Sequence, residues 1–591
     1  MIQLVSRWGK ELDKEYVLKE YPRPGLVRDS YLNLNGEWEY CISTQKKTDQ
    51  YDGTILVPFS PESMLSGVGK ILQPDQYLHY RTSFSIPDGF VKKRVLLHFG
   101  AVDQECEVYV NGMYVGKHIG GYLPFSFDIT ECLKEENELK VIVTDKTELA
   151  PHARGKQKLH NNSGMSSLFY TPQSGIWKTV WIESVEKSYI DQIKITPLYD
   201  EAAVRIRIIS KGEEISGATI TVLDQGAVRT TVEANADRDI VIPINDFQSW
   251  SPDNPYLYDL EVRLGDDVVR SYFGMRKYSV AKDANGILRF FLNNKPFFFN
   301  GVLDQGYWPD GLMTAPSDEA LIYDIVKLKE YGFNTIRKHI KVEPERFYYH
   351  CDRLGMIVWQ DMPNGGGDYN MAFVTYLPNG LGNFARGIKD HHYKWFKRED
   401  EEGRKQYYRD LQGMLRLLYN YPCIAVWVPF NEGWGQFDAR KVSEKVKKWD
   451  STRLVNEACG WFDQKGGDMY SIHNYLRKLK VSPKSDRVVA LTEYGGYAFP
   501  VEGHLACEKK FGYQKYATTE ELTKNYKRLW DEEIFPNLAR GLSSAIYTQT
   551  SDIEEEVNGV MTYDREVDKL GMEVVYELNQ KLYRMFDELT K

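Results

Sequence analysis

The chain has 591 residues, with 84 Asp and Glu against 75 Lys and Arg, which gives a formal net charge of −9. A chain of this length is expected to form several domains, because single hydrophobic cores stop growing at smaller sizes. The acidic balance argues against a nucleic-acid partner or an anionic membrane surface. No apolar run of about eighteen residues occurs, so no membrane-spanning helix is predicted.

The cysteines and the N-terminus indicate the compartment. The seven cysteines are odd in number and lack Cys-x-x-Cys spacing, which fits a reducing environment. The N-terminal residues lack the basic segment and the following apolar segment of a secretory signal. We therefore expect a cytoplasmic protein.

Residues 1–187 are predicted to form a β-sandwich. Short segments rich in strand-forming residues recur, as at 94–99, 106–110 and 139–143. Asn111-Gly112 directly follows one of them and is a strong hairpin signal. Residues 188–277 alternate apolar and polar side chains at period two, as at 204–208, which is typical of an immunoglobulin-like sandwich.

The pattern changes after residue 277 to alternating strands and helices, which predicts a parallel sheet. The helix after the first strand is expected to begin at Ser317 and to stop at Gly332. The predicted strands lie at 297–302, 334–337, 356–361, 424–430, 453–455, 469–473, 488–493 and 543–547. Eight such strands over residues 278–591 predict a (β/α)₈ barrel, whose active site lies at the carboxyl ends of its strands.

Two of these strands end in a glutamate. Glu432 follows the fourth strand within Asn431-Glu432-Gly433, and Glu493 ends the seventh strand before an aromatic residue and two glycines. A lone glutamate at a strand end more often caps the following turn. A pair at the same barrel edge, however, matches glycoside hydrolysis, which needs a proton for the leaving oxygen and a negative charge near the anomeric carbon.

Other polar residues are expected around this pair. Asn431 can hydrogen-bond a sugar hydroxyl, and Tyr475 after strand six can donate to the nucleophile. Arg337 can pair with one carboxylate and so separate the two pKa values, and it can equally be a barrel-end salt bridge. Further candidates for the pocket wall are Asp304, Asn474, Trp434, Trp461 and Tyr547, although an aromatic residue at a barrel rim more often serves packing.

The sequence also resembles glycoside hydrolase family 2. Residues 120–130 are similar to part of that family's N-terminal jelly-roll domain, and residues 174–183 to its closing strand. Residues 250–258 and 273–276 resemble the middle domain and its exit. Asn431-Glu432 looks like the family's acid/base pair, and Thr492-Glu493-Tyr494-Gly495 like its nucleophile motif. The resemblance implies a retaining, exo-acting β-glycosidase with Glu432 as acid/base and Glu493 as nucleophile.

Two departures from the family pattern affect the choice of sugar. The histidine after Arg337 stands two positions on, at His339, where the family commonly has it three positions on. The aromatic residue of strand eight is Tyr547, where the family usually has Trp. The Asn-x-Lys motif with which the family's β-glucuronidases bind the uronate is also missing, since the nearest stretch is Asn558-Gly559-Val560.

A β-galactoside is the leading expectation for the substrate, because it is the family's largest substrate group. The alternative is a β-hexuronide, either a galacturonide or a glucuronide, favoured by the positive charge of Arg337, Lys338, His339 and Lys341. Alternate residues of a strand face away from the pocket, so Lys338 can face the helices instead. A catalytically inactive carbohydrate-binding protein is a third possibility, but it predicts the loss of one glutamate.

The remaining expectations concern partners and metals. The adjacent pair His391-His392 has no evident third ligand, so neither a metal nor another cofactor is expected. The segment 363–394 is longer than an ordinary loop between a strand and a helix, and we expect it to form a roof over the active site. The expected partner is a small glycoside or oligosaccharide, with no nucleic acid and no membrane, and a homo-oligomer remains open.

Overall fold

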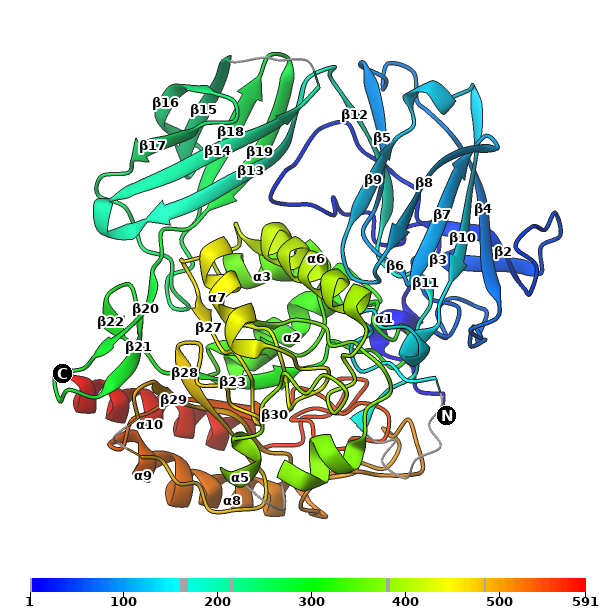
Figure 1. Cartoon of the computed structure of the whole chain (residues 1–591). Helices are drawn as coiled ribbons and strands as arrows, with labels where there is room; N and C mark the ends of the chain where they lie inside the picture. Colours follow the sequence, from blue (N-terminus) through cyan, green and yellow to red (C-terminus); the bar gives the residue numbers. More distant parts are fainter. Residues whose placement is uncertain (1–2, 160–167, 213–216, 379–382, 483–484) are drawn as a thin grey trace.

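The computed structural model describes residues 3–159, 168–212, 217–378, 383–482 and 485–591 of the chain. Figure 1 shows two β-sandwiches side by side above a third body that contains the parallel barrel. The fold class predicted from the sequence is confirmed: a jelly-roll sandwich, an immunoglobulin-like sandwich and a (β/α)₈ barrel.

The first sandwich consists of antiparallel sheets. One sheet has the order β1 (Leu32–Asn33), β12 (Val180–Val185), β5 (Arg94–Phe99), β9 (Phe125–Asp128). The other has the order β3 (Gly53–Val57), β2 (Gly36–Ser43), β4 (Tyr77–Ser85), β10 (Glu136–Thr144), β7 (Glu105–Val110), β8 (Met113–Ile119), and a short pair is formed by β6 (Val102–Asp103) and β11 (Gly175–Ile176). Asn111 and Gly112 join β7 to β8 with φ values of 53° and 77°, which a two-residue type I′ hairpin requires. The predicted hairpin is confirmed.

The second sandwich shows how period-two patterning builds a core. Its sheets have the orders β13 (Tyr189–Leu198), β14 (Ala203–Lys211), β17 (Asp239–Pro243), and β16 (Ala227–Asn235), β15 (Gly217–Asp224), β18 (Tyr258–Leu264), β19 (Asp267–Phe273). In β14, Val204 and Ile206 are buried between the two sheets, whereas Arg205 and Arg207 are exposed. Burial of alternate side chains therefore sets the strand register.

The barrel consists of parallel strands in the order β27 (Leu454–Val455), β26 (Ile424–Val428), β25 (Ile357–Asp361), β24 (Thr335–Lys338), β23 (Phe299–Asp304), β30 (Leu542–Thr548), β29 (Val488–Gly495), β28 (Met469–Asn474). No ladder joins β27 to β28 among the described residues, so the barrel is nearly closed. A small antiparallel sheet of β20 (Tyr278–Lys282), β21 (Leu288–Leu292) and β22 (Lys295–Pro296) precedes it. Phe290 of β21 packs against Phe299 and Trp359 of the barrel.

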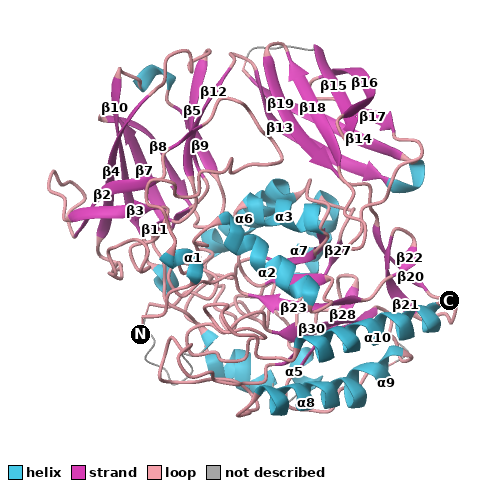
Figure 2. Cartoon of the chain, turned by 180° about the vertical axis from the view of Figure 1, so that it is seen from behind, coloured by secondary structure: helices cyan, strands magenta, loops and turns pink. Residues whose placement is uncertain are grey.

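Helices cover the outside of the barrel. Figures 1 and 2 show α2 (Asp318–Glu330), α3 (Glu345–Leu354), α6 (Glu401–Leu418) and α7 (Ala439–Trp449) on the side that faces the sandwiches. On the other side lie α8 (Thr519–Leu529), α9 (Phe535–Leu538) and α10 (Met572–Thr590), while α1 (Arg7–Lys10) and α5 (Asn383–Arg386) are single turns. The Ser317 hydroxyl accepts a hydrogen bond from the Ala320 amide at the start of α2, as the sequence predicts. Among the described residues, no helix combines the length and apolarity that a membrane span needs.

The first sandwich is packed directly onto the barrel. Tyr122, Tyr170 and Trp177 belong to the same core cluster as the barrel strands. The Arg154 amide donates to the carbonyl of Asn364, in a loop of the barrel, over 2.9 Å. A segment of the N-terminal domain is thereby held along the edge of the barrel where its strands end, which brings side chains of that domain to the site described below.

Candidate active site

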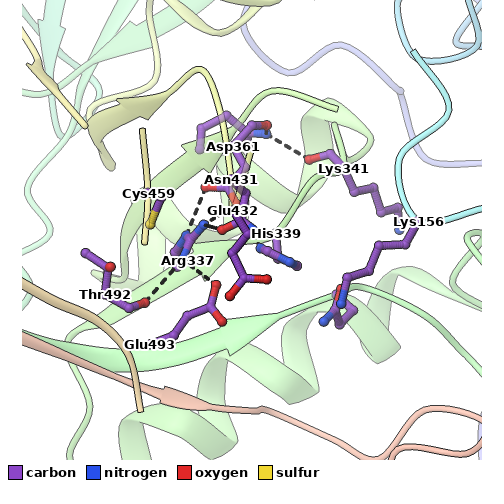
Figure 3. A network of polar contacts seen from close by, with 12 residues as sticks. Lys156, Arg337, His339, Lys341, Asp361, Asn431, Glu432, Cys459, Thr492 and Glu493 are labelled. Carbon is purple, nitrogen blue, oxygen red and sulfur yellow. Dashed lines mark hydrogen bonds and ion pairs between the residues drawn. The ribbon is translucent and has the colours of Figure 1, made fainter. Parts of the chain in front are cut away.

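Glu432 and Glu493 lie together at the carboxyl end of the barrel strands (Figure 3). Glu493 belongs to β29 and is buried, whereas Glu432 follows β26 and its side chain is 15% exposed. The backbone of Glu432 has a φ of 50°, and its amide donates to the carbonyl of Cys459 over 2.8 Å. One oxygen of each carboxylate and a ring nitrogen of His473 all lie within 4.8 Å of one another.

Arg337 connects the nucleophile candidate to the neighbouring strands. Its Nη1 donates to Oε1 of Glu493 over 2.9 Å, and its Nε and Nη2 donate to the two oxygens of Asp361 over 3.0 and 2.8 Å. Nη2 also donates to Oδ1 of Asn431 over 2.7 Å. Burial alone would raise the pKa of Glu493, but the positive charges of His473 and Arg337 lower that pKa to about 2. Glu493 is therefore ionised at neutral pH.

His473 in β28 contacts both glutamates. Its Nδ1 lies 2.7 Å from Oε1 of Glu432, and its Nε2 lies 3.5 Å from Oε1 of Glu493 and 3.2 Å from the Cys459 sulfur. Burial alone would lower the pKa of His473, but the nearby acidic groups, Glu493 foremost, raise it to about 10. A Cβ at Gly460 would lie only 2.7 Å from this ring, so the absence of a side chain there is required.

His473 was not among the site residues predicted from the sequence. Its only signal was its position at the end of strand six, directly before the candidates Asn474 and Tyr475. Glu432, His473 and Glu493 are also the one group of three within the described chain that is compact enough to hold a metal ion. In this structure the three side chains contact one another directly, with the His473 ring between the two carboxyl groups, as in an ion-pair network.

Tyr475 fixes the second oxygen of Glu493. Its hydroxyl forms a short hydrogen bond to Oε2 of Glu493 and lies 3.1 Å from Oγ1 of Thr548. The Tyr475 ring stacks on Tyr513 with their centroids 4.0 Å apart. Tyr513 also lines the pocket, and sequence reasoning did not find it because it stands in a long segment with no strand-end position.

Three aromatic candidates are placed differently. Trp434 and Trp461 line the pocket around the glutamates. Tyr547 is not among the described residues that line it, since its ring is buried edge-on against Tyr494 and Tyr526 behind the strands. The expectation that Tyr547 contacts the sugar is thereby corrected, because its side chain faces the surrounding helices.

The basic run from Arg337 to Lys341 covers the end of β24 and the residues after it, and its side chains point in different directions. His339 lines the pocket with Nδ1 2.8 Å from Asp361, and burial together with the charges of Lys156 and Arg337 holds the pKa of His339 well below its usual range. Lys338 points outward, where its Nζ lies 4.2 Å from the centroid of the Phe347 ring in α3. Lys341 donates to the carbonyl oxygens of Gly306 and Met313.

Both lysines are paired with buried carboxylates. Lys338 donates to Asp304 over 2.6 Å and to Glu343 over 2.8 Å, and Lys341 donates to Glu343 over 2.8 Å. None of these four residues lines the pocket, so the expected contacts of Lys338 and Asp304 with the sugar are corrected. Asn474 is also turned away from the glutamates, since its amide donates to Glu533 over 3.1 Å.

A further wall of the pocket comes from the N-terminal domain and from the loop after β30. Lys156 is buried, and its Nζ lies 3.4 Å from the Tyr170 hydroxyl and 3.8 Å from Oε1 of Glu556. Tyr170 and Gln549 donate to Glu556 over 2.7 and 3.0 Å. Figure 3 shows Lys156 on the far side of His339 from Arg337. No sequence pattern predicts this wall, since it joins residues of separate domains.

The expected roof is described only in part. Thr375, within residues 363–394, lines the pocket. Residues 379–382 of the same segment lie outside the described residues. The described part therefore contributes at least one side chain to the wall.

Comparison with known proteins assigns the family. Three family models match successive parts of the chain: the sugar binding domain of glycosyl hydrolases family 2 over residues 68–162, glycosyl hydrolases family 2 over 188–276, and the TIM barrel domain of that family over 287–575. The chain belongs to glycosyl hydrolase family 2. The resemblance drawn from the sequence motifs is thereby confirmed.

Relatives within family 2 carry more than one name. A β-galactosidase of Thermoanaerobacter pseudethanolicus is 24% identical over 507 residues, covering 80% of this chain and 62% of the relative. A β-glucuronidase of Streptococcus agalactiae is 23% identical over 435 residues, covering 70% of this chain and 68% of the relative. The solved β-D-glucuronidase of Dictyoglomus thermophilum has a TM-score of 0.72 at 19% identity, covering 95% and 98% of the two chains, which shows a shared fold. This chain spans less than two thirds of the length of the first of these relatives.

Proposed function

We propose that this protein is a retaining, exo-acting β-glycosidase that releases terminal β-linked sugars by double displacement. The observation that carries the proposal is the approach of Glu432 and Glu493, which have carboxylate oxygens within 4.8 Å of each other. Retaining glycosidases have their two carboxyl groups about 5–5.5 Å apart, whereas inverting ones need about 6.5–9.5 Å to admit a water molecule. The close pair favours direct attack by one carboxylate.

The surroundings of the two glutamates suit different roles. Glu493 is buried and ionised, and Arg337 and Tyr475 each hold one of its oxygens, which orients it as the nucleophile. Glu432 lines the same pocket but is partly exposed, so it can exchange protons with solvent, which suits an acid/base.

Two steps follow from these roles. In the first, a Glu493 oxygen bonds to the anomeric carbon as the bond from that carbon to the leaving oxygen breaks, and Glu432 gives its proton to the leaving oxygen. In the second, Glu432 takes a proton from water, the water oxygen bonds to the anomeric carbon, and Glu493 leaves as a carboxylate. The buried Nδ2 of Asn431 has no partner among the described residues and can donate to a sugar hydroxyl near the reacting carbon.

For the sugar we propose a neutral β-galactoside. The charge of Lys338 and Lys341, which had favoured a hexuronide, is neutralised by Asp304 and Glu343 outside the pocket. Lys156 reaches the pocket, but its ammonium lies 3.8 Å from Glu556. A lysine and a carboxylate side by side offer donors and an acceptor, which suits sugar hydroxyls, whereas Glu556 would repel a uronate.

A β-hexuronide is the second candidate. Lys156 is a buried cation at the pocket, and a sugar carboxylate would compete with Glu556 for it. A β-glucuronidase among the relatives also supports a β-hexuronide substrate. A catalytically inactive carbohydrate-binding protein is the remaining alternative, and the presence of both glutamates argues against it.

The test is a panel of p-nitrophenyl β-glycosides: galactoside, glucuronide and galacturonide. We expect the galactoside to have a kcat/KM at least about tenfold above either uronide, because Glu556 would repel the uronate carboxylate. One contact between charged groups changes the rate by roughly that factor. Proton NMR of the first-formed sugar should show the β-anomer. A uronide preference that disappears in Lys156→Met would overturn the choice of sugar. Binding of sugars with no turnover of any glycoside would instead favour the carbohydrate-binding alternative.

A further inference from the structure

A second and larger hollow adjoins the catalytic pocket. The two share Trp461 and Tyr475 on their walls. The second hollow has a volume of about 1080 Å³, at the upper end of the roughly 300–1,000 Å³ typical of ligand sites. It follows β28 and the described residues beyond it, up to the start of β29, and we call it the basic groove.

The charge of the basic groove is opposite to that of the chain as a whole. Six lysine and arginine side chains line it: Arg386, Lys465, Arg477, Lys478, Lys480 and Arg487. The acidic side chains among its described lining residues are Asp463 and Asp486, and Asp463 is paired with Arg487 over 2.7 Å. A local excess of positive charge on a protein of net charge −9 concentrates anions at that surface.

Three of the lysines are free of salt bridges within the described residues. Lys465, Lys478 and Lys480 are exposed and form no salt bridge in the part of the chain that the structure describes. Arg386 is held in place, since its Nη1 donates to the carbonyl of Ser471 over 3.0 Å and its guanidinium lies over the Tyr470 ring. Scattered lysines of a solvated surface need no ligand. These lysines instead surround one hollow that opens from the catalytic pocket.

The direction of the groove indicates which part of a substrate it meets. It includes His473, which contacts Glu432, the residue proposed to protonate the leaving oxygen. Lys156 and Glu556, by contrast, line the catalytic pocket alone. The terminal sugar therefore fits between the glutamates and the Lys156 wall, and the leaving group points into the groove. Trp461 borders both hollows and offers a ring for stacking between them.

We propose that the basic groove binds the aglycone of the substrate and that this aglycone is an acidic sugar, carrying a carboxylate or a sulfate. This inference rests on the proposed glycosidase function and extends it to the leaving-group side. Ammonium and guanidinium groups form charge-assisted hydrogen bonds to both kinds of anion. The charge is thus recognised beyond the scissile bond and not in the sugar that is released.

The experiment uses three disaccharides with the same terminal sugar, chosen as the one the glycoside panel ranks first. Their reducing sugars differ only at C6, as hydroxymethyl, carboxylate or sulfate ester. We expect an acidic aglycone to raise kcat/KM about threefold to tenfold at low ionic strength, as exposed ion pairs allow. This gain should become smaller in 0.5 M salt, because dissolved ions screen the attraction between exposed charges. A gain with only one of the two anions identifies which one the groove prefers.

Matched variants separate the groove from general charge effects. The combined variant Lys465→Gln, Lys478→Gln, Lys480→Gln should bring the kcat/KM values of the three disaccharides within about twofold of one another, mainly by lowering those of the two acidic ones. The control carries Lys282→Gln, Lys448→Gln and Lys524→Gln at exposed positions outside the groove, and it should retain the preference. Equal turnover of the three disaccharides by the unaltered protein overturns the inference while leaving the proposed function intact.

A binding measurement keeps the inference testable if no glycoside is turned over, which would refute the proposed function itself. The three disaccharides are then titrated calorimetrically into Glu493→Gln at low and high salt. Tighter binding of an acidic disaccharide than of the neutral one, lost in the combined lysine variant, supports the groove. Equal affinities overturn it.

Discussion

Nδ1 of His473 lies 2.7 Å from Oε1 of Glu432, while Nε2 of the same ring lies 3.5 Å from Oε1 of Glu493. One imidazole thus contacts both carboxylates of the proposed double displacement. Since the pKa of His473 is raised to about 10, the ring carries a positive charge between them at neutral pH. This charge stabilises the buried carboxylate of Glu493, the proposed nucleophile.

The first prediction concerns His473→Gln. The positive charge of His473 lowers the pKa of Glu493, so a neutral replacement must raise that pKa, and the acidic limb of the kcat/KM profile should move to higher pH. We also expect kcat/KM at neutral pH to fall about ten- to a hundredfold, as for a lost charge-assisted contact. The measurement is a pH–rate profile, with the exposed His391→Gln as control. An unmoved acidic limb would show that His473 serves packing alone.

The second prediction separates the roles of the glutamates. Glu493→Gln should abolish turnover of every glycoside. Glu432→Gln should be partly rescued on aryl glycosides with good leaving groups, because those need little protonation. Azide should restore turnover of Glu432→Ala with a β-glycosyl azide as product, detected by NMR. If azide rescued Glu493→Ala instead and gave the β-azide, the two roles would be exchanged.

The third prediction tests the Lys156 wall. Lys156→Met should lower kcat/KM for the β-galactoside about tenfold or more, since a donor to a sugar hydroxyl is lost. Glu556→Gln should lower kcat/KM by a similar factor. Because the two side chains lie 3.8 Å apart, the loss of activation free energy in the double variant should be smaller than the sum of the losses in the two single variants. Turnover of the three p-nitrophenyl glycosides by all variants provides the check. Loss confined to the uronides would favour the second candidate function.

The fourth prediction concerns stability. Lys338→Met leaves Asp304 and Glu343 with one fewer buried cation, so the free energy of unfolding should fall by about 3–5 kcal/mol, as for a broken buried ion pair. The sugar preference should stay the same because Lys338 lies outside the pocket. Urea unfolding measures the first effect, and the exposed Lys282→Met is the control, expected within about 0.5 kcal/mol of the unaltered protein. Unchanged stability with an altered sugar preference would identify Lys338 as a substrate ligand.

The sequence by itself predicted the features that depend on neighbours along the chain. Period-two patterning placed strands such as β14 and β18, and Asn111-Gly112 specified the turn between β7 and β8, because local backbone preference decides a two-residue hairpin. Apolar runs ending in a polar residue located Glu432 and Glu493 at strand ends. A closed parallel barrel then brings such ends together whatever their separation in the sequence.

Only the tertiary structure decided which polar side chains face the pocket and what neutralises them. Arg337 and Lys338 are adjacent in β24, yet one donates to Glu493 while the other turns to Asp304 and Glu343, since successive residues of a strand point to opposite sides. Lys156 and Glu556 stand in different domains, and the seating of the first sandwich on the barrel brings them within 3.8 Å. Charge pairs of this kind are set by packing between distant segments, and no local pattern in the sequence encodes them.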